Sequence, residues 1–205
     1  MKMNLLMVGL AAAALTVAVT ASHAEDTQAA FTERLKHDFH AKGIATIDRL
    51  DQDVVQATCS LHHLDELPAV LMRNLEQQEL ASVRYPADGK YMGDWVRGQS
   101  LAESGVGNTW KDKPGAPNGG NCYNCHQIGP DEPSFGTIGP SLLHYGKIRG
   151  NSEAIQKYTY AKIYNSKGFN LCTAMPRFGH VGALTEQQIK DLVALLLDPE
   201  SPVNK

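Results

Sequence analysis

The stretch Gly120-Asn121-Cys122-Tyr123-Asn124-Cys125-His126 carries the most specific pattern in the chain, Cys-x-x-Cys-His. This spacing is the attachment signature of a c-type haem. Two thiols three residues apart lie on one turn, where both can reach the vinyl groups of a haem and form thioethers. The adjacent His126 can then point its imidazole at the iron. The motif therefore predicts one covalent haem c, held by Cys122, Cys125 and His126.

Two other chemistries use a cysteine pair of this kind. A redox Cys-x-x-Cys normally follows a strand of a βαβ unit, and no such pattern precedes Cys122. A structural zinc site needs four ligands, usually including a second cysteine pair, which this sequence lacks. Both alternatives are weaker than covalent haem.

His126 leaves the sixth coordination position of the iron to be filled. Met175 lies between two predicted helices, where a loop can fold over the distal face of a haem. The proline that follows it favours an extended backbone at the methionine. Thioether ligation raises the reduction potential and leaves no open position, which suits electron transfer. We expect Met175 to be the ligand, with Met92 and His144 as alternatives.

Residues 1–24 have the pattern of a signal peptide. Lys2 precedes an uncharged apolar run, and Ser22-His23-Ala24 is a small-x-small site that predicts cleavage after Ala24 and export to the periplasm. A membrane anchor is the weaker reading because the apolar run is short for a span. No second run of spanning length follows, so we expect no membrane span in the mature chain. A net charge of −3 without a basic stripe argues against nucleic-acid binding.

The chain has four cysteines, of which haem attachment would use two. Cys59 and Cys172 remain, and an even pair in an exported protein favours a disulfide. The alternatives are two free buried thiols, or a bond from Cys172 to a partner chain.

The pattern of apolar residues predicts an all-α protein, because helical spacing recurs and no useful alternating run appears. Residues 25–88 read as a helical extension, including a short helix over 46–57, and turn residues near 85–89 mark a boundary before a domain over 89–205. Gly98 within the first domain helix fits either a close helix crossing or plain exposure. His62-His63 read as solvated surface rather than metal ligands, and Trp110 as a partner contact or a residue packed on the haem edge. The expected helix starts are Asp94, Asn151 or Ser152, and a capping box of Thr185 with Gln188.

Residues from about 93 to 197 resemble a class I cytochrome c. The chain is similar to the SoxX family, the monohaem subunits of the SoxAX cytochromes of sulfur-oxidising bacteria. Four segments carry this similarity: Asp94 to Gly98, Gly120 to His126 with the haem motif, Gly139-Pro140-Ser141-Leu142 and Met175-Pro176-Arg177-Phe178-Gly179. The resemblance implies a class I cytochrome c fold around one haem, with His126 and Met175 on the iron. It also implies that the Pro140 carbonyl accepts a hydrogen bond from the other ring nitrogen of His126 and orients the ring.

The same resemblance implies a function and partners. The chain would be the electron-transfer subunit of the L-cysteine S-thiosulfotransferase SoxAX and would not be catalytic on its own. A SoxA haem subunit would join thiosulfate oxidatively to a cysteine of the SoxYZ carrier, and this chain would accept the electrons and pass them to a small cytochrome. A free periplasmic electron shuttle and a haem-based sensor are the alternative functions.

Overall fold

The computed structural model describes residues 29–61 and 66–205. The predicted signal peptide and His62-His63 lie outside the described residues. The described part of the chain contains helices and a single isolated β-bridge, and no strand, in agreement with the all-α prediction. The chain divides into two compact units, one ending at Asp51 and the other beginning at Gln52.

The first unit holds the helical residues 29–38 and the 3-10 helix η1 (Ile47–Leu50). Lys36 Nζ lies 3.1 Å from Asp51 Oδ1, which ties the helix to the residue after η1. The predicted single helix over 46–57 is wrong. The backbone is extended at Asp51, and Asp53 begins a new helix by accepting a 2.8 Å hydrogen bond from the N–H of Gln56.

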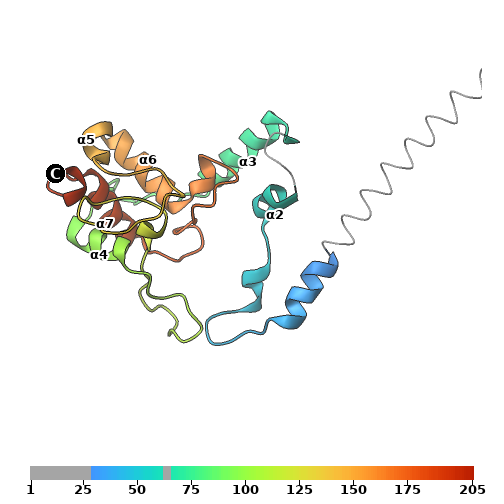
Figure 1. The fold of residues 1–205 in the computed structure, drawn as a ribbon. Helices are drawn as coiled ribbons and strands as arrows, with labels where there is room; N and C mark the ends of the chain where they lie inside the picture. Colours follow the sequence, from blue (N-terminus) through green and yellow to red (C-terminus); the bar gives the residue numbers. More distant parts are fainter. Residues whose placement is uncertain (1–28, 62–65) are drawn as a thin grey trace, which may run out of the picture. The chain divides into compact units, whose positions relative to one another are not determined.

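The second unit contains six α-helices among its described residues, joined by loops and 3-10 turns (Figure 1). Its α2 and α3 come from the sequence assigned to the N-terminal extension, so they fold within the same unit as the haem motif. The elements are α2 (Val54–Leu61), α3 (Ala69–Ala81), α4 (Trp95–Glu103), η3 (Cys122–Asn124), α5 (Tyr145–Arg149), α6 (Glu153–Tyr164), η4 (Ser166–Gly168), α7 (Glu186–Leu197) and η5 (Pro202–Asn204).

Helix α7 is the centre of this unit and lies between α4 and the α5–α6 pair (Figure 1). The capping box of Thr185 and Gln188 begins it, as predicted. Eight of its twelve residues are buried, because its apolar positions meet neighbours on several sides. Helix α7 therefore packs against α4, α5 and α6 and forms the core of this unit.

The crossing of α4 and α7 explains Gly98. A Cβ on Gly98 would lie 2.1 Å from the backbone oxygen of Asp191, so only glycine allows the two helices to approach this closely. Asp94 caps α4 as predicted, accepting from the N–H groups of Val96 and Arg97. Of the two readings of Gly98, the close crossing is correct.

The remaining helices show what local signals can and cannot predict. Ser152 caps α6 through a hydrogen bond from the Ile155 N–H, one of the two predicted starts. Helix α5 was not predicted, because five residues are too few to show a period. None of the helices in the described part of the chain has the length and apolar run that a membrane crossing requires.

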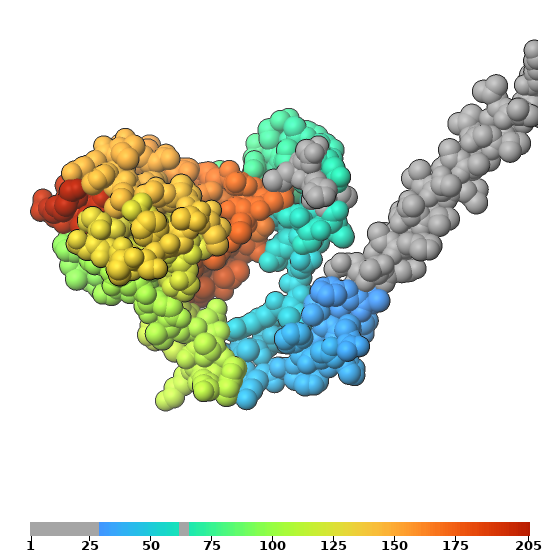
Figure 2. Space-filling model, in the orientation of Figure 1, coloured from blue at the N-terminus to red at the C-terminus, as the bar shows by residue number. Residues whose placement is uncertain are grey.

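The segment 105–118 projects from the helices as a loop (Figure 2). Its base is closed by a hydrogen bond from the Gly119 N–H to the Val106 carbonyl. Trp110 lies on this loop, about half exposed, with Lys111 Nζ 5.1 Å from its ring centroid. It is not among the residues that line the apolar cavity described below.

Candidate functional site

The Cys-x-x-Cys-His stretch forms one tight turn. Asn121 has a left-handed backbone (φ 48°), η3 follows, and the N–H groups of Cys125 and His126 both donate to the Cys122 carbonyl, at 3.1 and 3.0 Å. The two cysteines are not bonded to each other. Burial raises the pKa of the Cys122 thiol to about 12. A neutral, buried thiol is not the activated thiolate of a redox motif, so this geometry disfavours the redox reading.

His126 is held by the segment that follows the turn. Its Nδ1 lies 2.7 Å from the Pro140 carbonyl oxygen, the contact that the resemblance implied. A carbonyl can only accept, so Nδ1 carries the proton, and Nε2 of the neutral ring is left with a free lone pair. A Cβ on Gly139 would lie 2.2 Å from Cε1 of His126, so the backbone passes directly against the ring. The ring is thus fixed in orientation and in tautomer.

Met175 lines an apolar cavity together with Cys122 and His126 of this turn. The same cavity is lined by side chains of α4, α6 and α7 and by the loops on either side. The cavity has a volume of about 50 Å³, which does not by itself indicate a haem site. The case for haem rests on the residues that line it. The lining residues are Ala102, Cys122, His126, Ile128, Leu142, Ile163, Met175, Phe178, Leu192, Leu195 and Leu196.

The alternative iron ligands lie elsewhere. Met92 packs against the main hydrophobic core, and His144 begins α5 with a left-handed backbone. Neither is among the residues that line the cavity. Of the three ligands considered for the sixth position, only Met175 shares the cavity with His126.

A disulfide joins Cys59 of α2 to Cys172, as predicted, with Cα atoms 5.4 Å apart. Cys172 belongs to the segment 169–184, here called the Met175 loop, which runs from η4 to α7. Leu171 of this loop packs with Val55 and Leu75 in a small second core. The loop that carries Met175 is therefore attached to α2 and α3 by a covalent bond and by apolar contacts.

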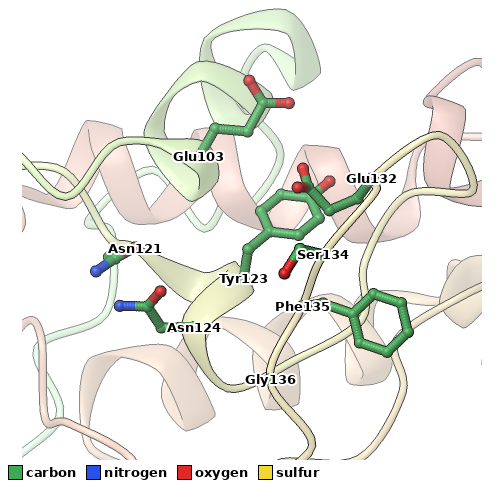
Figure 3. A pocket seen from close by; sticks show the side chains of 8 residues that line it. All are labelled: Glu103, Asn121, Tyr123, Asn124, Glu132, Ser134, Phe135 and Gly136. Carbon is green, nitrogen blue, oxygen red and sulfur yellow. The ribbon is translucent and has the colours of Figure 1, made fainter.

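A polar pocket is lined in part by Asn121, Tyr123 and Asn124 of the haem-motif turn (Figure 3). The carboxylate of Glu132 lies beside the ring of Tyr123, and Glu103 and Phe135 also line the pocket. Burial, with the nearby charge of Glu103 in second place, raises the pKa of Tyr123. Across residues 29–61 and 66–205, no three His, Cys, Asp or Glu side chains gather where they could hold a metal ion.

Sequence reasoning missed the residues that contact the Met175 loop through ion pairs and hydrogen bonds. The Met-Pro-Arg-Phe-Gly segment gives no indication of a role for Arg177. In the structure Arg177 forms ion pairs with Asp53 and Glu79. Ser166 donates to the Met175 carbonyl oxygen at 2.6 Å. No local signal predicts the two ion pairs, because Glu79 and Asp53 lie 98 and 124 residues before Arg177.

The geometry defines an all-α protein in which Cys122 and His126 of a Cys-x-x-Cys-His turn line one apolar cavity with Met175, whereas Cys125 is not among the lining residues. A protein of Aquifex aeolicus (strain VF5), described as an uncharacterized lipoprotein, is 40% identical over 157 residues, which cover 75% of this chain and 73% of that protein. The chain belongs to the same family as this lipoprotein. No family model matches the chain.

One solved structure is also similar. It is the crystal structure of SoxXA from P. pantotrophus, with 26% sequence identity, covering 52% of this chain and 82% of that chain, at a TM-score of 0.37. That TM-score is too low to establish a common fold.

Proposed function

We propose that the chain is a monohaem c-type cytochrome that transfers electrons. The observation that carries the proposal is the shared cavity, which brings both motif residues Cys122 and His126 together with Met175 among apolar side chains. The lone pair on His126 Nε2 supports the proposal because it is what an iron ligand needs. In this proposal residues 89–205 form the cytochrome domain with a class I fold, and residues 25–88 form its helical extension.

The residues of the cavity fit a covalently attached haem. When bound through thioethers to Cys122 and Cys125, with His126 and Met175 on the iron, haem c supplies one-electron redox chemistry. The protein's own part would be to orient the His126 ring through Pro140, to supply the Met175 thioether within the same cavity, and to surround the group with apolar side chains. A histidine and methionine pair leaves no position for a substrate, which favours electron transfer over catalysis or gas sensing.

Within this class, we propose that the chain acts as the SoxX-like subunit of a SoxAX cytochrome. The support is the resemblance of four segments to that family, at 94–98, at the haem turn, at Pro140 and at Met175. It would pair with a SoxA haem subunit, accept the electrons released when thiosulfate is joined to a SoxYZ cysteine, and pass them to a small cytochrome. The chain alone would not carry out the conjugation.

Export to the periplasm is part of the proposal. The Aquifex relative is described as a lipoprotein, a class of exported proteins, and the Cys59–Cys172 disulfide is typical of an oxidising compartment. These observations support export, and cleavage after Ala24 stays a prediction from the sequence.

The iron ligands are tested by the spectrum of the oxidised, haem-loaded protein. A weak thioether-to-iron absorption band at the red end should be present, should vanish in Met175→Ala and should persist in Met92→Ala. Persistence of the band in Met175→Ala would overturn the ligand assignment. Absence of covalent haem from protein matured in a host that attaches c-type haem would overturn the proposal as a whole.

The assembly is tested by purification and reconstitution. The chain should purify from its host with a second haem protein, and thiosulfate conjugation should require that partner. A chain that purifies alone and reduces or oxidises small cytochromes would instead be a free shuttle. Conjugation by the single chain would refute the assignment as a non-catalytic subunit.

A further inference from the structure

The Met175 loop carries a buried positive charge at Arg177, two residues after the proposed iron ligand. The side chain of Arg177 is only 7% exposed. Its Nη2 donates to Asp53 Oδ2, and its Nη1 lies 3.2 Å from Glu79 Oε2. A buried guanidinium is tolerated only where carboxylates compensate its charge. The charges of Asp53 and Glu79 therefore stabilise the loop in this position.

The two carboxylates belong to the sequence before the cytochrome domain. Asp53 is 39% exposed and begins α2, and Glu79 is 12% exposed and lies near the end of α3. The disulfide from Cys59 to Cys172 adds a second attachment between α2 and the same loop. The helices α2 and α3 thus hold the loop by charge as well as by a covalent bond.

Hydrogen bonds lead from this charged cluster to the ligand's backbone. Asn165, fully buried, donates from Nδ2 to Glu79 Oε2 at 2.7 Å. The next residue, Ser166, donates to the Met175 carbonyl oxygen at 2.6 Å. The Met175 segment is therefore held from both sides, by Ser166 at Met175 itself and by the ion pairs at Arg177.

We infer that Arg177, held by Glu79 and Asp53, is a positioning residue that keeps Met175 on the iron, so that α2 and α3 control how easily the sixth ligand is displaced. The inference rests on the proposed haem ligation. An added ligand can bind the iron only while the methionine is dissociated from it. The apparent affinity for the added ligand therefore depends on the fraction of molecules in which the Met175 loop has moved away. Weakening the ion pairs should raise that fraction without removing the thioether.

The test is cyanide binding to the oxidised, haem-loaded protein, followed by the haem spectrum and by loss of the thioether-to-iron band. In Glu79→Gln the shape and the acceptor for Asn165 are kept, but the charge facing Arg177 is lost. We expect the cyanide concentration for half-displacement to fall about tenfold, the equivalent of about 1.4 kcal/mol. Asp53→Asn, at the more exposed end, should fold readily and shift the same concentration in the same direction by a smaller factor.

The matched control breaks an ion pair away from the loop. Arg97→Gln removes the partner of Asp191 at the crossing of α4 and α7 and should lower the melting temperature. Its cyanide half-displacement should equal that of the wild type, which separates positioning from general destabilisation.

The possible outcomes separate the inference from the proposed function. If Met175→Ala loses the band and shows much tighter cyanide binding, while Glu79→Gln and Asp53→Asn bind cyanide as the wild type does, only the inference is overturned. If Arg97→Gln shifts cyanide binding as much as Glu79→Gln, a positioning role is likewise overturned. If Met175→Ala keeps the band, the ligand assignment itself fails.

Discussion

The two proposed iron ligands are held in opposite ways. His126 is held by neighbours in sequence, since the turn at Cys122 and the carbonyl of Pro140 are at most fourteen residues away. Met175 is held by residues far away in sequence, through a disulfide that spans 113 positions and an ion pair that spans 124. A ligand held locally can form its site early and keep it, whereas a ligand held by distant contacts depends on the whole unit being folded. Changes elsewhere in the chain should therefore affect ligation by Met175 more than ligation by His126.

The largest expected effect breaks the distant side alone. Replacing both Cys59 and Cys172 by Ser removes a cross-link around a long loop, and the chain-entropy model gives a loss of roughly 4–5 kcal/mol. Urea unfolding of the haem-loaded protein measures this loss. We also expect the thioether-to-iron band to disappear at lower temperature while the haem remains covalently attached. A loss below about 1 kcal/mol with an unchanged band would show that the bridge does not hold the Met175 loop.

The next effect tests the scaffold shared by both sides. Burial would raise the pKa of Asp191, but hydrogen bonds from Arg97, from the Asp94 N–H and from Gln187 outweigh it and leave the pKa below its usual value. A lowered carboxylate pKa stabilises the fold above the unfolded value of about 3.9, and this stability is lost as the pH falls through the folded pKa. Asp191→Asn should therefore cost about 2–3 kcal/mol at pH 7, at the low end for a broken buried pair because Arg97 can reach water.

The pH dependence of Asp191→Asn is the sharper measurement. The difference in unfolding free energy from the wild type should be constant near neutral pH and should shrink as the pH falls below about 4, where Asp191 is protonated in the unfolded chain but still ionised in the folded one. The thioether-to-iron band at neutral pH should stay as in the wild type, because this ion pair contacts neither the Pro140 segment nor the Met175 loop. A difference that grows on acidification would contradict the sign of the shift.

The smallest effect acts on the local side. Gly139→Ala would place a methyl group 2.2 Å from Cε1 of His126, and the backbone cannot easily retreat because its N–H donates to the Cys125 carbonyl. Overpacking of this kind costs about 1–3 kcal/mol. The fraction of chain that carries covalent haem and the reduction potential should both change. Ile138→Ala, at an exposed neighbouring position, should leave both unchanged.

The sequence predicted the parts of this molecule that are encoded over a few residues. The caps at Asp94, Ser152 and Thr185 and the Cys-x-x-Cys-His turn all depend on neighbours within one turn of chain, so a pattern can show them. The disulfide followed from counting thiols.

What the sequence could not predict depends on partners brought together by folding. Gly98 was ambiguous until the position of α7 showed what a side chain would strike. The pairing of Arg177 with Glu79 and Asp53 has no signal in sequence, because surface carboxylates are common and nothing marks the two that become buried beside a guanidinium. The early part of the chain therefore reads as a polar extension although α3 packs closely against η4.

The 113-residue separation of the disulfide has a consequence for how the protein matures. Four cysteines can pair completely in three ways, and each complete pairing consumes both thiols of the haem motif. In the unfolded chain the closure entropy favours the nearest pair, Cys122 with Cys125, over the distant one. Productive maturation thus requires that Cys59 and Cys172 be oxidised to a disulfide while Cys122 and Cys125 stay reduced. We expect protein exported without haem attachment to accumulate the Cys122–Cys125 bond. Peptide mapping without reduction would reveal it, and two free motif thiols in such protein would show that folding, rather than haem, protects them.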